Sequence, residues 1–217
     1  DPLSPDWLHR YSEAARLAYA DRARHVADPD FVAVPLAGLL DPGYLRQRAA
    51  LIGPTSLGLA PAGRPPGMAQ AWAPQAEQPE YGTSHLSVAD AHGQVLALTS
   101  SIEAAFGARL MSDGGTGLPG GFLLNNHLTD FALQPSGSDG RPVANRLQPG
   151  KRPRSSMSPT LVFERAGGRL ALVAGSPGGA AIIHFTAKTL LGTLAWGLDV
   201  QQAIALPNFG SRNGPTE

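Results

Sequence analysis

The sequence contains no cysteine among its 217 residues, which excludes disulfides, zinc–thiolate sites and cysteine nucleophiles. Lysine is almost absent too: Lys151 and Lys188 are the only two among 17 basic residues. The 17 acidic residues balance them, so the formal net charge is zero. A neutral chain has no electrostatic basis for binding nucleic acid or an anionic membrane. No apolar run reaches membrane-spanning length, and the first residues are not a signal peptide.

The six histidines lack the spacing of a metal site, such as His-x-x-x-His, so no metal is expected. They are His9, His25, His85, His92, His127 and His184. With 42% apolar residues, the chain can bury a core as one large domain or two small ones.

Two helices are expected in the first fifty residues. Between Pro5 and Arg22, apolar residues recur at helical spacing and charged residues fall mainly off that stripe. The stripe consists of Leu8, Tyr11, Ala15 and Ala18, and the charged residues are Arg10, Glu13 and Arg16. After a turn at 28–30 and a short extended run at 31–35, Asp41 can cap a second helix that runs to about Leu51, with Pro42 at its favoured first position.

The segment 53–82 has no periodicity. It holds six prolines and five glycines in thirty residues, which indicates an exposed, mobile stretch. A cleavage site at its end, beside Thr83, would be accessible.

After Thr83 the apolar period changes to two, as in a β-strand, and a turn at 90–93 leads back into a second strand. This hairpin places Ser100 and Ser101 level with Thr83. A strand is also expected at 122–124, and a second hairpin from Thr160–Phe163 and Leu170–Ala174. Helices are expected at about 180–196 and at 200–205, so the pattern predicts an α+β protein with a helix-covered sheet.

Thr83 would become an N-terminal residue if the Gly82–Thr83 bond were cut. An N-terminal threonine carries both a nucleophilic hydroxyl and an α-amine that takes the proton. That amine has a reference pKa of roughly 7.7–8.0, close to the pH at which a general base works best. The alternative is that Thr83 only begins a strand.

Three other stretches have both a chemical and a structural interpretation. The glycine-rich turn 175–179 precedes a helix, where unpaired N–H groups can form an oxyanion hole or simply make a tight turn. Ser155 and Ser156 follow a basic run and can bind a carboxylate or belong to a solvated loop. Asp130 can hold an ammonium group or serve as a turn residue.

Taken together and in this order, the motifs resemble the γ-glutamyltranspeptidase family of N-terminal-nucleophile (Ntn) hydrolases. The resemblance covers essentially the whole chain. The matching blocks are Leu17–Arg22, Asp28–Phe31, Thr83–His85, Phe106–Gly107, Leu123–Asn126, Asp130–Phe131, Lys151–Pro153, Ser155–Thr160 and Gly175–Gly179.

The resemblance implies an incomplete Ntn αββα sandwich and a zymogen that cleaves itself before Thr83. Residues 1–82 would be the C-terminal part of the large subunit, and 83–217 most of the small, catalytic one. The implied enzyme transfers a γ-glutamyl group from glutathione-like amides to water or amino acids, without a cofactor. The remainder of the large subunit would be its partner, and the location would be periplasmic or secreted.

The resemblance also implies a role for individual residues. Thr83 would be the nucleophile, Ser101 the hydroxyl that hydrogen-bonds it, and Gly178 with Gly179 the oxyanion hole. Ser155 and Ser156 would bind the α-carboxylate of the substrate, and Asp130 would bind its α-amino group. Glu103 would contact the same end of the substrate, the one that carries both groups.

His127 departs from the family pattern, which usually has Gln or Glu beside the α-amino group. An imidazole is a poorer partner for an ammonium than a carboxylate or amide oxygen. One alternative is therefore an acylase of the same fold that acts on glutaryl-type cephalosporin side chains. Another is an unprocessed, catalytically silent chain, and we expect the Gly82–Thr83 bond of the isolated 217 residues to be intact.

Overall fold

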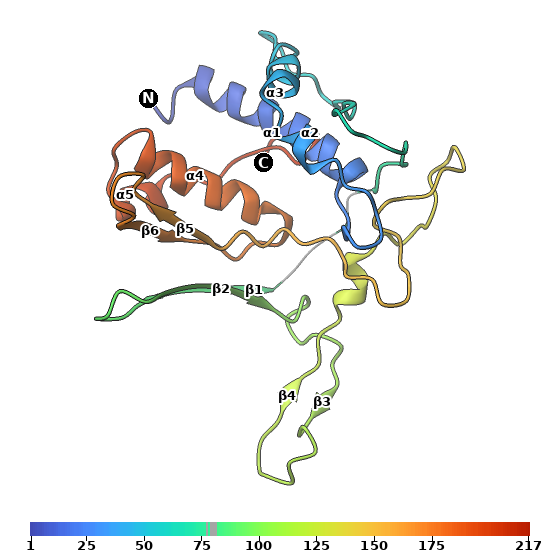
Figure 1. Ribbon diagram of the computed structural model, residues 1–217, viewed down its shortest axis with the longest axis vertical. Coiled ribbons are helices and arrows are strands. Elements are labelled where there is room, and N and C mark those ends of the chain that lie inside the picture. The colour runs from blue at the N-terminus through green and yellow to red at the C-terminus, as the bar shows by residue number, and fades with distance from the viewer. Residues whose placement is uncertain (77, 79–81) are drawn as a thin grey trace. The chain divides into compact units, whose positions relative to one another are not determined.

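The computed structural model describes residues 1–76, 78 and 82–217, so Tyr81, beside the expected cleavage point, lies outside the described residues. The chain forms two compact units (Figure 1). The first comprises Asp1–Gln78, Leu128–Ser155 and Phe209–Glu217, and the second comprises Pro79–His127 and Ser156–Asn208. These spatial units do not follow the expected subunit division at residue 82, which stays a prediction about processing.

The first unit contains the two expected helices. They are α1 (Pro5–His25) and α3 (Pro42–Ala49), with the short α2 (Leu36–Leu39) between them. The hydroxyl of Ser4 accepts a hydrogen bond from Trp7 N at 3.3 Å, and the carboxylate of Asp41 accepts one from Tyr44 N at 2.8 Å. Both caps satisfy backbone donors that have no partner within the helix. Helix α2 was not predicted, because it has four residues and no capping side chain.

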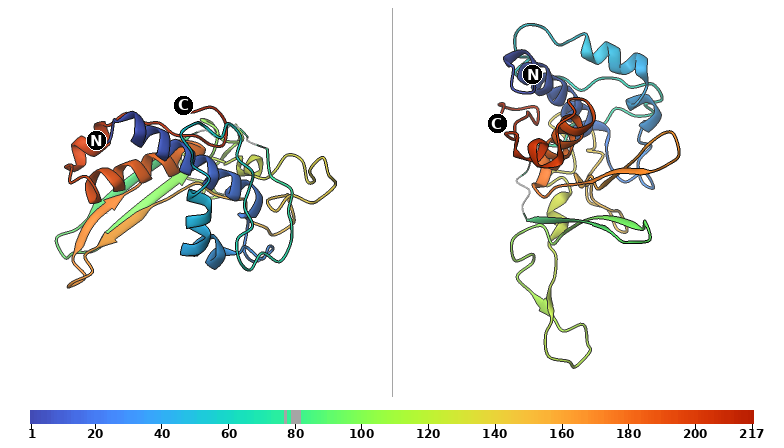
Figure 2. Two further views of the ribbon diagram at one scale, coloured as in Figure 1. Left: turned by 90° about the horizontal axis from the view of Figure 1, so that it is seen from above. Right: turned by 90° about the vertical axis from the view of Figure 1, so that its left-hand side faces the viewer.

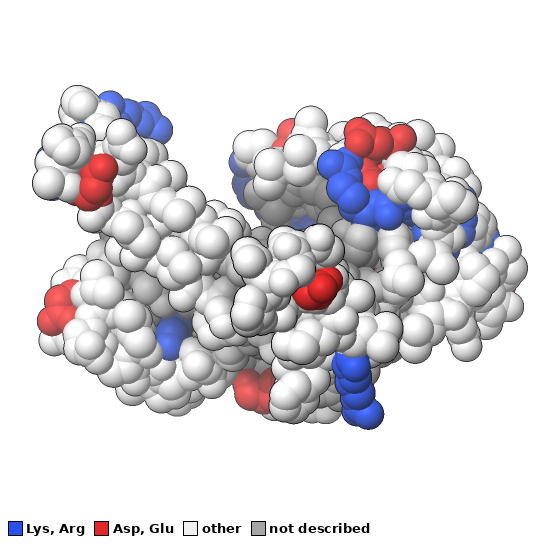
Figure 3. Space-filling view, turned by 90° about the horizontal axis from the view of Figure 1, so that it is seen from below, with Lys and Arg blue, Asp and Glu red and all other residues white. Residues whose placement is uncertain are grey.

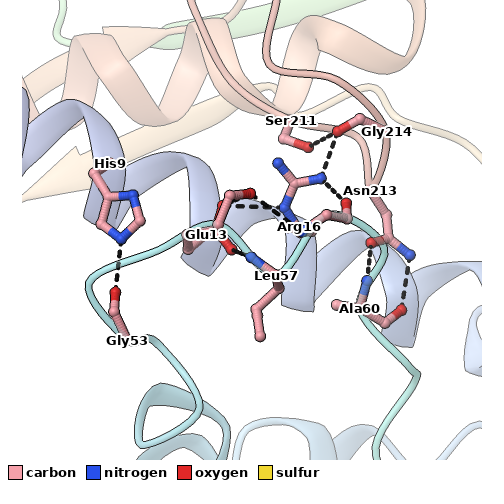
Figure 4. A network of polar contacts seen from close by, with 11 residues as sticks. His9, Glu13, Arg16, Gly53, Leu57, Ala60, Ser211, Asn213 and Gly214 are labelled. Atoms are coloured by element: carbon pink, nitrogen blue, oxygen red, sulfur yellow. Dashed lines mark hydrogen bonds and ion pairs between the residues drawn. The ribbon is translucent and has the colours of Figure 1, made fainter.

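The expected buried face of α1 was wrong. Ala18 is exposed, whereas Glu13 and Arg16 retain only 1% and 3% of their accessible surface. The two side chains form an ion pair of 3.1 Å between Arg16 Nε and Glu13 Oε1. A buried charge is tolerated when it is paired and hydrogen-bonded, and irregular chain segments supply those bonds here (Figure 4).

Two segments without helix or strand pack on this ion pair (Figure 4). Glu13 accepts hydrogen bonds from Ser56 Oγ at 2.7 Å and from Leu57 N at 2.8 Å. Arg16 donates to the carbonyl oxygens of Gly58 and Gly214. Burial alone would raise the pKa of Glu13, but these hydrogen bonds and the Arg16 charge hold it below its usual value. The charged pair therefore ties α1 to both segments.

The segment after α3 lacks regular structure and most of its described residues are exposed, as predicted, but a few of them are buried. Ala60, Trp72 and Ala73 are buried. Ala73 N donates to Pro142 O at 3.0 Å, and the Trp72 ring packs in a small core with Val32. Backbone hydrogen bonds to other parts of the unit replace those that a helix or sheet would provide.

The main elements of the second unit are two β-hairpins and two helices. The first hairpin pairs β1 (Thr83–Ala89) with β2 (Val95–Ser101), and the second pairs β5 (Thr160–Phe163) with β6 (Leu170–Ala174). Helix α4 (Ile182–Leu194) follows a short 3-10 turn, and α5 (Val200–Ala205) follows α4. The elements form layers in which β5–β6 lies between α4 and β1–β2 (Figures 1 and 2). Both hairpins and both helices were predicted from the sequence.

The contact between the two hairpins explains why residue 175 is glycine. A Cβ on Gly175 would lie 2.1 Å from the His85 ring, so any larger residue would push the two layers apart. His85 is in turn held by a bond of 2.8 Å between its Nδ1 and Thr99 Oγ1. On the opposite side of the hairpin, Leu86 and Leu98 form a directly opposed pair and are exposed. Of the expected αββα sandwich, the second unit thus contains one helical layer and two sheet layers. The apolar face of β1–β2 that carries Leu86 and Leu98 is exposed.

A minor hairpin completes the second unit: β3 (Met111–Ser112) pairs with β4 (Phe122–Leu123). On the face shown in Figure 3, acidic and basic side chains are few and scattered. Within the described ranges, no helix has both the length and the apolar character needed to cross a bilayer.

The buried ion pair on α1 leads to a stability prediction. Replacement of Arg16 by alanine should destabilise the protein by about 3–5 kcal/mol, because it leaves the Glu13 carboxylate buried without its partner. Arg10→Ala is the matched control: Arg10 pairs with Asp6 on the same helix, but in an exposed position. Its loss should cost far less, because solvent screens an exposed ion pair. Urea denaturation measures both values, and equal losses would contradict a stabilising role for the buried pair.

Candidate active site

Thr83 begins β1 and lies directly opposite Ser101, the last residue of β2. The hairpin predicted from the sequence also placed Ser101 level with Thr83, so this prediction is confirmed. The hydroxyl of Ser101 accepts a hydrogen bond from Glu103 N at 2.8 Å and donates its own proton to the carbonyl oxygen of Gly82. The acceptor is the carbonyl of the peptide bond that precedes Thr83. A donor at this oxygen withdraws electron density from the carbonyl carbon and favours attack on it.

The backbone around this bond is tightly packed. Gly82 has a φ of +49°, and a Cβ at this position would lie 2.6 Å from the carbonyl oxygen of Glu103. Glu103 itself has a φ of +72°, which is costly for a residue with a side chain. Glycine is therefore required at position 82, and the chain after β2 turns sharply back against it.

Two residues after β4 hold this sharp turn in place. Asn126 Nδ2 donates to the Glu103 carboxylate, and Asn126 Oδ1 accepts from Ala104 N at 2.9 Å. The Nε2 atom of His127 lies 3.1 Å from the carbonyl oxygen of Ser101, an acceptor, so Nε2 carries the proton. The structure thus brings together Thr83, Ser101, Glu103 and His127. Asn126 had no predicted role, although its place in an Asn-Asn pair after a strand was a usable signal.

Gly178 and Gly179 lie where β6 passes into α4. Gly179 starts a 3-10 turn (Gly179–Ala181), and both glycines have positive φ, of +133° and +54°. A Cβ on Gly178 would lie 2.5 Å from the Phe185 ring, so both the backbone angle and the space require glycine. N–H groups at the start of a helical segment have no acceptor within it, which suits them to an oxyanion.

The remaining expected residues are divided between the two units. Asp130 and Ser155 belong to the first unit, whereas Ser156 belongs to the second and is buried. Asp130 ends a 3-10 turn (His127–Asp130), and Ser155 is exposed at the end of the basic run. Among the described residues, no group of three or more His, Asp and Glu side chains is placed to hold a metal ion.

Solved structures give the fold class. The crystal structure of a cephalosporin acylase from Bacillus halodurans matches 96% of this chain with a TM-score of 0.68, at 21% sequence identity and over 33% of its own length. At this identity the likeness establishes a shared fold and nothing more.

Sequence comparison gives the family. The family model described as gamma-glutamyltranspeptidase matches residues 1–217, and the chain belongs to this family. It is 40% identical over 206 residues to a glutathione hydrolase proenzyme of Bacillus subtilis (strain 168), covering 91% of this chain and 33% of that protein. It is 32% identical over 215 residues to the acylase ACY 1 proenzyme of Pseudomonas sp. (strain V22), covering 99% of this chain and 34% of that protein. The chain therefore spans about one third of the length of these relatives.

The Ser101 hydrogen bond can be tested through cleavage before Thr83. Ser101→Ala in the full-length protein should slow the appearance of a chain beginning at Thr83 by about 10²-fold, the usual cost of removing one such donor. Ser101→Thr keeps the hydroxyl and should cleave at close to the wild-type rate. Ser100→Ala, one residue away and exposed, is the matched control. Time-resolved mass spectrometry measures the rates; an unchanged rate in Ser101→Ala would contradict the assignment.

Proposed function

We propose that the full-length protein is a self-cleaving γ-glutamyltransferase and hydrolase with Thr83 as its nucleophile. The observation that carries the proposal is the hydrogen bond from Ser101 Oγ to the carbonyl oxygen of Gly82, directly before Thr83. Membership of the gamma-glutamyltranspeptidase family supports the same conclusion. So do relatives whose names contain the word proenzyme, since this term describes a precursor that is cut before it acts.

In the proposed self-cleavage, Thr83 Oγ1 attacks the carbonyl carbon of Gly82. The C–N bond breaks as the C–O bond forms, and the proton of the hydroxyl ends on the threonine nitrogen. Water then hydrolyses the resulting ester, which leaves a carboxylate on Gly82 and a free amine on Thr83. The packed backbone at Gly82 and the positive φ of Glu103 support this step, because local strain favours a reaction that releases it.

In the proposed turnover, the same hydroxyl attacks the γ-carbonyl carbon of a glutathione-like donor. The α-amine of Thr83 takes the proton and passes it to the departing amine, and an acyl-Thr ester remains. Water or the amine of an amino acid then attacks this ester and restores Thr83. Donors at the oxyanion stabilise both steps, and the N–H groups of Gly178 and Gly179 are the candidates.

An acylase that acts on glutaryl-type side chains is a second candidate function. The match to an acylase proenzyme over 99% of this chain favours it. His127 favours it as well, because an imidazole is a poorer partner for a substrate ammonium than a carboxylate or amide oxygen. A glutaryl group is a γ-glutamyl group without the α-amino group, so the two functions differ at the residues that bind the ammonium.

Replacement of the nucleophile tests the proposed mechanism. Thr83→Ala in the full-length protein should abolish both self-cleavage and turnover of γ-glutamyl anilides, because one hydroxyl serves both acyl transfers. Thr83→Ser should keep part of each. Intact-mass measurement and anilide release provide the two readouts. Processing of Thr83→Ala at the wild-type rate would remove Thr83 from the mechanism.

A substitution at Asp130 tests whether the enzyme recognises the α-ammonium group of a γ-glutamyl donor. Asp130→Ala should raise KM for a γ-glutamyl anilide about ten- to a hundredfold, the cost of losing a charged hydrogen bond of about 1.5–3 kcal/mol. KM for the matching glutaryl anilide, which has no ammonium, should change little. Equal losses on both donors would mean that Asp130 has only a structural role.

A further inference from the structure

Asn145 is a buried residue that neither sequence motif nor family role had singled out. It retains 1% of its accessible surface in the first unit, and the structure shows partners for both ends of its side-chain amide. Its Oδ1 accepts from Arg154 N at 2.9 Å, while its Nδ2 donates to Asp130 O at 2.8 Å and to Gln75 Oε1 at 2.9 Å. These partners fix the orientation of the amide, because only the oxygen can accept from an N–H group.

The two backbone partners belong to the two segments of the first unit that are expected to bind the substrate. Asp130 is the candidate for the substrate ammonium, and Arg154 directly precedes Ser155, a candidate for the carboxylate. One planar amide therefore joins the backbone of both elements. The backbone of Asn145 adds a further bond, since its carbonyl accepts from Ala132 N at 3.0 Å.

Two backbone hydrogen bonds hold the chain directly before Ser155, and Asn145 accepts one of them. Pro153 has no N–H, so Arg152 and Arg154 supply the two N–H groups nearest to Ser155 on its N-terminal side. Arg152 N donates to Asp28 Oδ2 at 2.8 Å, and Arg154 N donates to Asn145. Asp28 and Asn145 thus hold the same short segment, but only Asn145 also holds Asp130.

We propose that Asn145 is a positioning residue that sets the spacing between the ammonium-binding Asp130 and the carboxylate-binding Ser155, and so selects ligands that carry both groups on one carbon. This inference rests on the proposed function. Gln75 holds the side-chain amide of Asn145 in place. Its Oε1 accepts a hydrogen bond from Asn145 Nδ2, and its Nε2 donates to Gln78 Oε1 at 3.0 Å.

The test compares two ligands that differ only in the α-amino group, L-glutamate and glutarate, by calorimetric titration of the full-length protein. Asn145→Asp keeps an oxygen for Arg154 N but loses the donor to Asp130. The affinity for L-glutamate should fall about tenfold, because a displaced Asp130 carboxylate loses its charged hydrogen bond to the ammonium. The affinity for glutarate, which has no ammonium, should be nearly unchanged. Asp28→Asn is the matched control on the serine side, and it should weaken both acids alike.

A further variant guards against misfolding of Asn145→Asp. Gln75→Met keeps the length of the side chain but removes the acceptor behind Asn145, and it should reduce the preference for L-glutamate in the same direction. Thermal unfolding of each variant establishes that it is folded.

The outcomes separate the inference from the proposed function. A wild-type protein that binds neither acid would overturn the proposed function and this inference with it. A wild-type protein that prefers L-glutamate, with an unchanged preference in the folded Asn145 or Gln75 variants, would overturn the inference alone.

Discussion

The pairing of Thr83 with Ser101 at the open end of the β1–β2 hairpin is the interaction on which the catalytic account depends. Antiparallel register places these two residues side by side, and a shift of one residue would turn every side chain of β1 to the other face. With this register, the Ser101 hydroxyl donates to the Gly82 carbonyl, and the sharp turn at Glu103 closes against Gly82. One hairpin thus supplies the candidate nucleophile and the group that polarises the bond in front of it.

Buried polar side chains hold the irregular parts of the first unit. Glu13 holds the segment after α3, Asp28 holds the chain at Arg152, and Asn145 holds both Asp130 and Arg154. In each case the partner is a backbone N–H or carbonyl group that no helix or sheet satisfies. Polar groups of this kind stabilise a structure when all their bonds are made and are costly when one is lost. The same physical device therefore supports both the fold and the elements expected to recognise the substrate.

Local signals explain why much of the fold followed from the sequence. The alternation after Thr83 and the Asp-Pro start of α3 each depend on neighbouring residues, and the strands and helix they predicted are present. The burial of Glu13 and Arg16 could not be predicted in this way. It depends on segments more than forty residues away, which cover a charged face of α1 that periodicity alone assigns to solvent.

The residues of the candidate site also fall into two groups, those that neighbouring residues predict and those that only the folded chain reveals. Thr83, Ser101 and the glycines at 178 and 179 are recognisable because their chemistry is tied to a strand end or a helix start. Asn126 and Asn145 are ordinary loop residues in the sequence, and only the folded chain shows which groups their amides join. The central claim concerns the bond before Thr83, and N-terminal sequencing of the purified full-length protein tests it most directly. We predict a chain that begins at Thr83; an uncut Gly82–Thr83 bond in protein that still releases γ-glutamyl groups would contradict the account.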